Sequence, residues 1–201
     1  MTFNELNEKF KEEIESKKLT LIHGNILSVK LPKFNKVVSL PPYHISSLLM
    51  SMLLLHDFKV AVIVLQKEFS QKILSEPGFA DYNHLSVEID YGFKSETILN
   101  SIPPSNFFPK PNTFSSIIKL TRKKPLLEVK DYLKFRDFLR QIFRLKNKNL
   151  SNAVQMTFPF SDKFRLDKEK FLKKLAKIGL KDVKVNLISS KEFAEIFNKL
   201  F

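Results

Sequence analysis

The first third of the chain alternates between helix-like and strand-like spacing of its apolar residues. At the N-terminus, apolar side chains recur at every fourth position among charged ones, which predicts an amphipathic surface helix. Short apolar runs bounded by turn-forming residues follow and predict strands. The order strand, strand, helix, strand, helix is typical of α/β architecture. The predicted helices are residues 4–17, 45–55 and 66–76, and the predicted strands are 19–23, a buried strand at 36–40, and 58–65, which we expect to be buried on both faces of a mostly parallel sheet.

The pattern changes further along the chain. Strand-like runs joined by short polar links have no crossover helix between them, so they predict antiparallel neighbours and a mixed sheet. Helical spacing then takes over, with Gly179 as the C-cap of one helix and Ser189 or Ser190 as the N-cap of the last. We therefore expect an α/β domain over residues 1–121 and a small all-helical domain over 122–201. The further strands are predicted at 85–93, 95–102 and 112–122, and the further helices at 129–146, 149–156, 167–178 and 189–200.

The most distinctive stretch is the end of the predicted strand at 36–40. Pro41 and Pro42 come directly after it, and neither a helix nor a strand can continue through both. Two prolines remove two backbone donors, which leaves the carbonyl groups before them unpaired and holds Tyr43 in one place. Loops at the carboxyl end of a strand are where open α/β sheets bind ligands. The stretch is therefore either a binding loop or a simple proline turn that closes a strand.

Charge narrows the partners of this chain of 201 residues. Lysine and arginine number 34 against 21 aspartates and glutamates, which gives a net charge of +13. This excess favours a polyanionic partner such as RNA, DNA or an anionic membrane surface. There is no cysteine and the four histidines lack ligand spacing, so no metal site is expected. The longest apolar run, at 48–55, is too short to cross a membrane, and the N-terminus lacks the pattern of a signal peptide. We expect a soluble, cytoplasmic monomer.

Positive charge concentrates between residues 110 and 150. In the helix predicted there, basic side chains recur every four residues while apolar ones occupy the opposite side. Such a row can follow a phosphate backbone, with an affinity that falls steeply with salt. The alternative is an ordinary solvated helix face. The residues expected to bind RNA are Lys110, Arg122, Lys123, Lys124, Arg136, Arg140, Arg144, Lys146 and Lys148.

Several segments resemble one enzyme family. The sequence VVSLPPYHISS at 37–47 is similar to the strand and proline loop of ribosomal RNA adenine N6,N6-dimethyltransferases of the KsgA and Erm type, which reads roughly VVSNLPYYISS. Residues 65–87 resemble the family's Gln-Lys-Glu helix and the segment after it, and residues 102–120 resemble its Phe-x-Pro-x-Pro loop and closing strand. Residues 138–154 and 187–200 are similar to its basic helix and its final helix. The matches occur in the family's order, so the chain is identified as a member of this family.

The resemblance implies a fold, a reaction and a site. The fold is a Rossmann-like methyltransferase sheet with a small helical C-terminal domain. The reaction is dimethylation of adjacent adenosines near the 3′ end of small-subunit ribosomal RNA, with S-adenosylmethionine as the methyl donor. The carbonyl of Pro41, just before Pro42, would hold the target amine, and the base would stack between Tyr43 and Phe107. Asn25 falls where the family has the aspartate that binds the adenine amino group of the donor.

Two departures from the family bear on catalysis. Leu40 stands where the family has asparagine, so its side chain offers no hydrogen bond to the target amine or to the cofactor. Losing one positioned polar group typically costs on the order of 3 kcal/mol. The family's glycine-rich turn, which binds S-adenosylmethionine, has no counterpart around the 4 glycines of this chain. We therefore expect an incomplete sheet without its first strands, in an N-terminally truncated member of the family.

The sequence leaves alternative functions open. The first is the family's dimethyltransferase activity in ribosome biogenesis. The second is a non-catalytic factor that binds ribosomal RNA and docks on the immature small ribosomal subunit, which the leucine at position 40 favours. A third and weaker alternative is a decaying gene product without a role. A row of arginines on one helix supports the first two alike, because both require binding to RNA.

Overall fold

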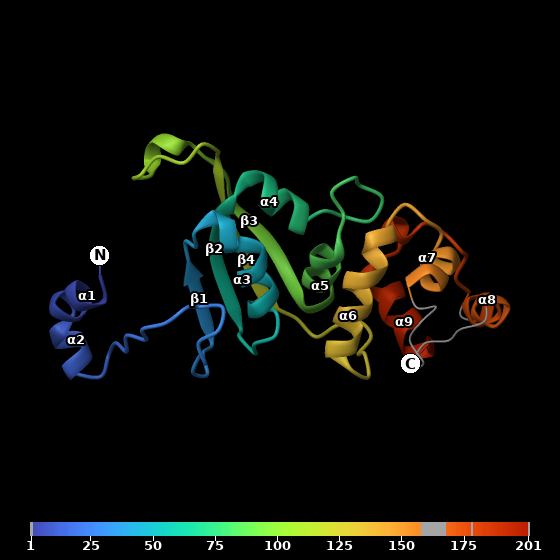
Figure 1. Cartoon of the computed structure of the whole chain (residues 1–201), viewed down its shortest axis with the longest axis horizontal. Coiled ribbons are helices and arrows are strands. Elements are labelled where there is room, and N and C mark those ends of the chain that lie inside the picture. Colours follow the sequence, from blue (N-terminus) through green and yellow to red (C-terminus); the bar gives the residue numbers. More distant parts are fainter. Residues whose placement is uncertain (1, 158–167, 178, 201) are drawn as a thin grey trace. The chain divides into compact units, whose positions relative to one another are not determined.

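A computed structural model of the chain describes residues 2–157, 168–177 and 179–200 (Figure 1). It separates into two compact units, Met1–Lys33 and Phe34–Phe201. The boundary between these units follows Lys33 and not residue 121. The expected domains 1–121 and 122–201 therefore stay a prediction. No helix within the described ranges is long and apolar enough to span a membrane.

Two short helices begin the N-terminal unit. α1 (Phe3–Lys9) starts at a capping box, in which the Thr2 amide donates to the Glu5 carboxylate at 2.7 Å and the Thr2 hydroxyl accepts from the Glu5 amide. α2 (Lys11–Glu15) follows after a one-residue break, so the single helix expected over 4–17 is in fact two helices. Neither helix contains a buried residue. Only α1 has a side-chain cap, so α2 has neither a cap of this kind nor a buried residue.

The strand expected at residues 19–23 is wrong. No neighbouring strand pairs with this segment in the described part of the chain, and its backbone is irregular. A strand is held by the hydrogen bonds of its neighbour, so apolar residues alone do not make one. A stacked contact between the rings of Phe3 and His23, with centroids 4.7 Å apart, packs the end of this segment against α1 instead.

The larger unit contains a mixed sheet of four strands. β1 pairs parallel with β2, while β4 pairs antiparallel with both β2 and β3. The expected mixed sheet with antiparallel neighbours is confirmed, but a mostly parallel sheet is wrong for the described residues. The order across the sheet is β1-β2-β4-β3. The strands are β1 (Lys36–Ser39), β2 (Val60–Gln66), β3 (Phe93–Ile102) and β4 (Ser115–Arg122).

Burial differs sharply between the two parallel strands. β1 lies at an edge of the sheet, and the side chain of Val38 is 86% exposed. The expectation of a buried strand here is wrong, because within the described residues β1 has a neighbour on one side only. β2 lies inside the sheet and buries Ala61, Ile63 and Leu65 completely, whereas its other face is half-buried. Burial of β2 on both faces is therefore only partly found.

Helices follow the strands, and one of them replaces a predicted strand. α5 (His84–Gly92) occupies the segment expected to be a strand at 85–93. The Asn83 side chain accepts from the Leu85 amide at 2.9 Å, and the Ser86 hydroxyl accepts from the Asn83 amide, which forms a capping box. The cap therefore starts a helix where β-branched residues suggested a strand. The other elements of this half are η1 (Tyr43–Ile45), α3 (Ser46–Leu53), α4 (Lys67–Ile73) and η2 (Pro104–Asn106).

The C-terminal third is helical, as predicted. Aromatic rings dominate its core, where Phe135 and Phe197 meet edge to face with centroids 5.3 Å apart. Ser189 caps the last helix through reciprocal hydrogen bonds with Glu192, and Gly179 adopts a positive φ of 73°. The elements are α6 (Tyr132–Ile142), η3 (Phe143–Leu145), α7 (Leu150–Thr157), α8 (Lys168–Lys177), η4 (Val185–Leu187) and α9 (Ser190–Leu200).

Candidate functional site

The proline loop follows β1 at the carboxyl edge of the parallel pair. Pro41 is buried and Pro42 is exposed, and η1 begins directly after them. The Ile45 amide donates to the Pro42 carbonyl at 3.1 Å, which closes the turn. The Pro41 carbonyl accepts no hydrogen bond from any residue that the structure describes. This oxygen therefore keeps an unused acceptor position in the loop.

Tyr43 is anchored to another strand of the sheet. Its hydroxyl forms a short hydrogen bond with the hydroxyl of Ser115, the first residue of β4. Ser115 is fully buried and lies opposite Gln66, the last residue of β2. Leaving a buried hydroxyl without a partner typically costs about 1–3 kcal/mol, so this bond strongly favours one position of the tyrosine. The sequence predicted the ring, and the structure supplies its anchor.

The loop between β3 and β4 is attached to the start of α4. The Phe114 carbonyl accepts from the Lys67 amide at 3.0 Å, and the Thr113 hydroxyl donates to the Glu68 carboxylate at 2.9 Å. A backbone hydrogen bond, followed by the one from Thr113, lowers the pKa of the Glu68 carboxyl. The Glu68 carboxylate is therefore ionised near neutral pH. It accepts hydrogen bonds from its own backbone amide and from the Thr113 hydroxyl.

Leu40 and Phe107, which were also predicted to contact the substrate, show no contact within the described residues that supports this role. Leu40 is 56% exposed, and its apolar side chain offers no polar atom beside the free carbonyl of Pro41. Phe107 is half-buried and makes no ring contact with Tyr43 in the described ranges. The stacking of a base between Phe107 and Tyr43 therefore stays a prediction.

Asn25, the other predicted cofactor residue, lies in the N-terminal unit. Its side-chain oxygen accepts from the Leu27 amide at 3.0 Å, which forms a local turn. The predicted pair Asn25 and Leu40 thus divides between two compact units. One side chain carries an acceptor that is already engaged and the other carries none. Binding of S-adenosylmethionine by Asn25 and Leu40 therefore stays a prediction. No group of metal-ligating side chains occurs in the described ranges.

Arg136, predicted to bind RNA, is buried instead. Its Nε lies 2.8 Å from a carboxylate oxygen of Glu88 on α5, and both side chains are removed from solvent. Its guanidinium also donates short hydrogen bonds to the carbonyl and hydroxyl of Ser51 on α3. The Tyr132 hydroxyl donates to the same carboxylate at 3.4 Å. Arg136 therefore joins three helices and is not free to contact a phosphate, because breaking a buried pair leaves an uncompensated charge.

Burial also changes the protonation of the groups around this pair. Burial raises the pKa of Glu88 to about 7, and the neighbouring Arg136 opposes this rise. One of the two carboxylate oxygens of Glu88 has no hydrogen-bond partner in the described part of the chain. Burial lowers the pKa of His84 to about 4, and the positive charges of Arg140 and Arg136 lower it further. His84 is therefore neutral at physiological pH.

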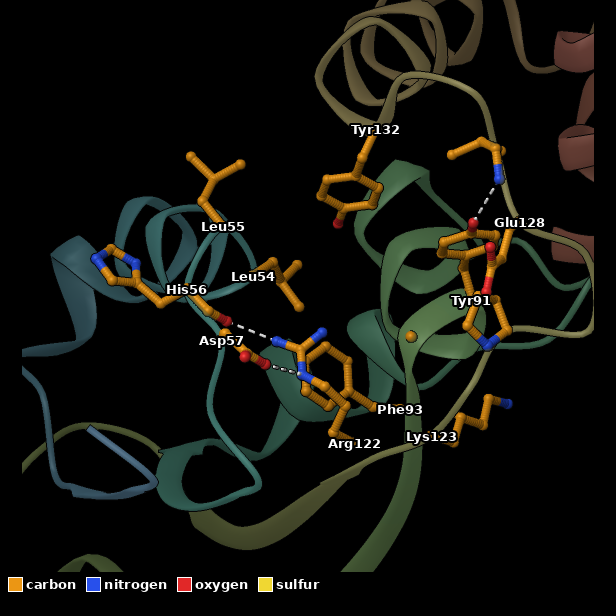
Figure 2. A pocket seen from close by; sticks show the side chains of 13 residues that line it. Leu54, Leu55, His56, Asp57, Tyr91, Phe93, Arg122, Lys123, Glu128 and Tyr132 are labelled. Atoms are coloured by element: carbon orange, nitrogen blue, oxygen red, sulfur yellow. Dashed lines mark hydrogen bonds and ion pairs between the residues drawn. The ribbon is translucent and has the colours of Figure 1, made fainter. Parts of the chain in front are cut away.

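A pocket of about 380 Å³ lies beside this junction (Figure 2). The predicted RNA-binding residue Arg122 forms part of its wall. Its Nε donates to the Phe58 carbonyl at 3.0 Å, a terminal nitrogen donates to the His56 carbonyl at 2.5 Å, and its guanidinium stacks over the Phe93 ring at 4.5 Å. Arg122 also pairs with Asp57 at 3.6 Å. These contacts assign Arg122 to holding the sheet together, so its expected role with RNA is not supported.

The remaining basic residues do not form one helical row. α6 ends at Ile142 and a tighter turn follows, so the four-residue spacing stops after Arg140. Lys146 donates to the Ala80 carbonyl at 2.6 Å. Lys123 and Lys124 form ion pairs with Asp90 and Glu128 at 3.4 and 3.7 Å. Of the residues expected to bind RNA, those that are exposed and form no such pair with any described residue are Lys110, Arg140, Arg144 and Lys148.

Known proteins match this chain over most of its length. A family model described as "Ribosomal RNA adenine dimethylase" matches residues 2–200. The chain belongs to this family. Two solved structures of the fold are similar: a dimethyladenosine transferase from Plasmodium falciparum (TM-score 0.70, 23% identity, 85% of this chain and 69% of that chain) and the 23S rRNA methyltransferase ErmE (TM-score 0.62, 20% identity, 98% of this chain and 78% of that chain). The Rossmann-like methyltransferase fold expected from the sequence is thereby confirmed.

Archaeal family members are similar in sequence. A probable ribosomal RNA small subunit methyltransferase A of Methanosarcina barkeri (strain Fusaro) is 38% identical over 139 residues, which is 69% of this chain and 48% of that protein. The protein of the same name from Methanococcus maripaludis (strain C7) is 38% identical over 157 residues, which is 75% of this chain and 59% of that protein. The chain thus spans about half the length of the curated relatives that it matches.

Sequence reasoning missed the residues of the buried junction. Glu88 lay in a predicted strand, and Ser51 and Ser115 carried no motif of their own. One signal was present, because Asn83 followed by a serine three positions later is a cap pattern, and Leu85 and Ile89 have helical spacing. The pairing of Glu88 with Arg136 had no comparable signal, since 48 residues separate them in the sequence.

Proposed function

We propose that the protein acts in the N6,N6-dimethylation of adenosines in small-subunit ribosomal RNA, during assembly of the small subunit. The family match and the names of the archaeal relatives support this activity. The observation that carries the proposal is the proline loop, where the Pro41 carbonyl is free and Tyr43 is anchored to β4. S-adenosylmethionine is the methyl donor of the reaction.

The loop is suited to holding an exocyclic amine. The Pro41 carbonyl can accept a hydrogen bond from the adenine amino group, which orients that group before reaction. The ring of Tyr43 can stack on a base that has left the RNA helix, and its hydroxyl bond to Ser115 limits the motion of the ring. We assign Pro41 and Tyr43 to the RNA substrate and no step to the methyl donor.

The exposed side of the helical region is suited to the RNA backbone. Arg140, Arg144 and Lys148 are exposed, and the chain carries a net charge of +13. Contacts of this type bind phosphates without reading sequence, and they weaken as salt rises. The partner is small-subunit ribosomal RNA in the immature subunit.

A second function, binding without catalysis, is favoured by Leu40. The leucine is 56% exposed at the position where the family has asparagine, so the hydrogen bond that would complement the Pro41 carbonyl is missing. Removing one positioned donor or acceptor of this kind costs a hundredfold or more in rate, or roughly 3 kcal/mol. A protein of this composition can still hold ribosomal RNA as an assembly factor.

Methyl transfer to small-subunit RNA tests the two functions together. The full chain and its Leu40→Asn variant are incubated with this RNA and labelled S-adenosylmethionine, and RNA binding is measured in parallel. Leu48→Asn, which alters an exposed leucine of α3, is the matched control. Transfer that rises at least about tenfold in Leu40→Asn alone supports the enzyme. Binding without transfer in every variant supports the assembly factor, and the absence of RNA binding contradicts both.

A further inference from the structure

The hairpin of β3 and β4 ends in an apolar arm, which we define as residues 98–114. Phe108 in this arm is 101% exposed, so it is fully accessible to solvent. Three more large apolar side chains of the arm, Ile98, Leu99 and Phe114, are about half-exposed. Figure 1 shows the part of the arm around η2 projecting away from the sheet. Phe108 lies in this projecting part, whereas Ile98 and Leu99 lie in β3 and Phe114 lies at the base of the arm. Exposed apolar side chains that continue from a strand onto a projection are typical of an interaction surface.

The arm is restrained at both its base and its tip. Its base is attached to α4 by the bonds of Phe114 to Lys67 and of Thr113 to Glu68. At its tip the Phe107 amide donates to the Pro104 carbonyl at 3.1 Å, and four prolines fix their own φ angles. A restrained backbone lowers the entropy lost when an exposed ring binds a partner.

The charge around the arm indicates a polyanionic partner. Within the sequence of the arm, Lys110 is the only charged residue, and it is positive. Lys110 lies two positions after Phe108 and is exposed. An aromatic ring beside a lysine is the combination with which proteins bind unpaired nucleotides, since the ring stacks on a base and the ammonium contacts a phosphate. An apolar protein partner would gain nothing from this positive charge.

We propose that the apolar arm is a second RNA contact, in which Phe108 stacks on an unpaired base next to the target adenosine and Lys110 contacts a neighbouring phosphate. The inference rests on the proposed function, because that function makes RNA the substrate. The proposed contact is separate from the proline loop. Because Phe108 needs an unpaired base, this contact selects RNA that is single-stranded beside the target.

Fluorescence of a short single-stranded oligoadenylate that carries 2-aminopurine tests the contact. Stacking on a phenyl ring changes the emission of 2-aminopurine, so the assay reports contact with the ring as well as affinity. Phe108→Ala in the full chain should raise the Kd roughly five- to a hundredfold and remove the change in emission. Phe108→Tyr should retain both, because tyrosine also stacks. Phe79→Ala, which removes an exposed phenylalanine outside the arm, should change neither.

Further outcomes separate this inference from the proposed function. A fully paired RNA duplex should bind Phe108→Ala and the parent chain equally, because its bases are not free to stack on the ring. Equal losses for duplex and single strand would overturn the stacking role. An unchanged Kd in Phe108→Ala, together with weaker binding after charge reversal at Arg140 and Arg144, would overturn the arm alone and leave its apolar side chains to a protein partner. Failure of the parent chain to bind any RNA would remove the proposed function itself.

Discussion

The junction of α3, α5 and α6 and the edge of the sheet at β1 use their residues in opposite ways. The junction removes an arginine and a glutamate from water and supplies them with hydrogen bonds from Tyr132 and to Ser51. The edge leaves Val38 and Leu40 largely in solvent and ends in a carbonyl without a partner. The comparison teaches that Arg136, which is buried and paired, has a structural role. The weakly packed edge instead carries the Pro41 carbonyl, whose oxygen has no partner among the described residues. Free polar groups, and not strongly bound ones, are therefore the better guide to the site.

We expect the largest difference between two single substitutions in α6, measured as the change in the free energy of unfolding. Arg136→Ala should lower the free energy of unfolding by about 3–5 kcal/mol, because it leaves Glu88 buried without its counter-charge. Arg140→Ala, one turn further along the same helix, should change it by less than about 0.5 kcal/mol, because its side chain is exposed. Denaturant unfolding of both variants measures the difference.

Replacement of both charged partners checks the cause. The double variant Glu88→Gln/Arg136→Met should recover much of the lost stability, since no unpaired charge remains. If Arg136→Ala and Arg140→Ala were equally mild, the contrast between buried junction and exposed surface would be wrong.

Removal of the tyrosine anchor should have a smaller effect. Tyr43→Phe deletes the hydroxyl that binds the buried Ser115, which should lower stability by about 1–3 kcal/mol. Thermal unfolding measures this loss, and Tyr43→Phe/Ser115→Ala, which removes both hydroxyls, should restore part of it. A double variant that is no more stable than Tyr43→Phe would argue against the anchor.

Charge reversal on the exposed surface should act on RNA affinity and not on the fold. Arg140→Glu/Arg144→Glu should raise the Kd for small-subunit RNA roughly tenfold, or about 1.4 kcal/mol, and should reduce the salt dependence of binding. Lys11→Glu/Lys191→Glu changes the net charge equally at exposed positions elsewhere and serves as the control. Equal effects of the two double variants would mean that total charge, and not this surface, governs binding.

The pH dependence of stability should give the smallest signal. The pKa of Glu88 is raised from 4.5 to about 7, so the unfolded chain releases this proton first as pH rises. The contribution of Glu88 therefore favours folding below pH 4.5 and is lost between pH 4.5 and about 7. The pKa of His84 is lowered from 6.5 to about 4, so its contribution is lost in the other direction, as pH falls through this window.

Comparison with Glu88→Gln separates the two groups. The stability of the parent chain minus that of the variant should decrease as pH rises from about 5 to 7, because only the parent carries the titrating carboxyl. Unfolding at several pH values measures this difference. A difference that stayed flat over this range would show that Arg136 holds the carboxylate ionised despite its burial.

Predictions from the sequence succeeded where a local pattern sufficed. The spacing of apolar residues located the C-terminal helices. Ser189 or Ser190 was expected as the cap of the last helix, and the structure shows Ser189 in this role, through bonds to a residue three positions away. The proline loop was found because proline acts on its own backbone. The strand at 19–23 failed for lack of a neighbouring strand, and α5 was missed because β-branched residues outweighed its cap pattern.

By itself, the sequence determined the family, the position of the proline loop and the excess of positive charge, since each is a property of neighbouring residues or of composition. Only the tertiary structure decided which basic residues are free. Arg136 and Arg140 have the same spacing and chemistry, yet one is buried against Glu88 and the other is exposed. The physical reason is that a partner 48 positions away sets the environment of Arg136, and no periodicity along one helix records where such a partner will lie.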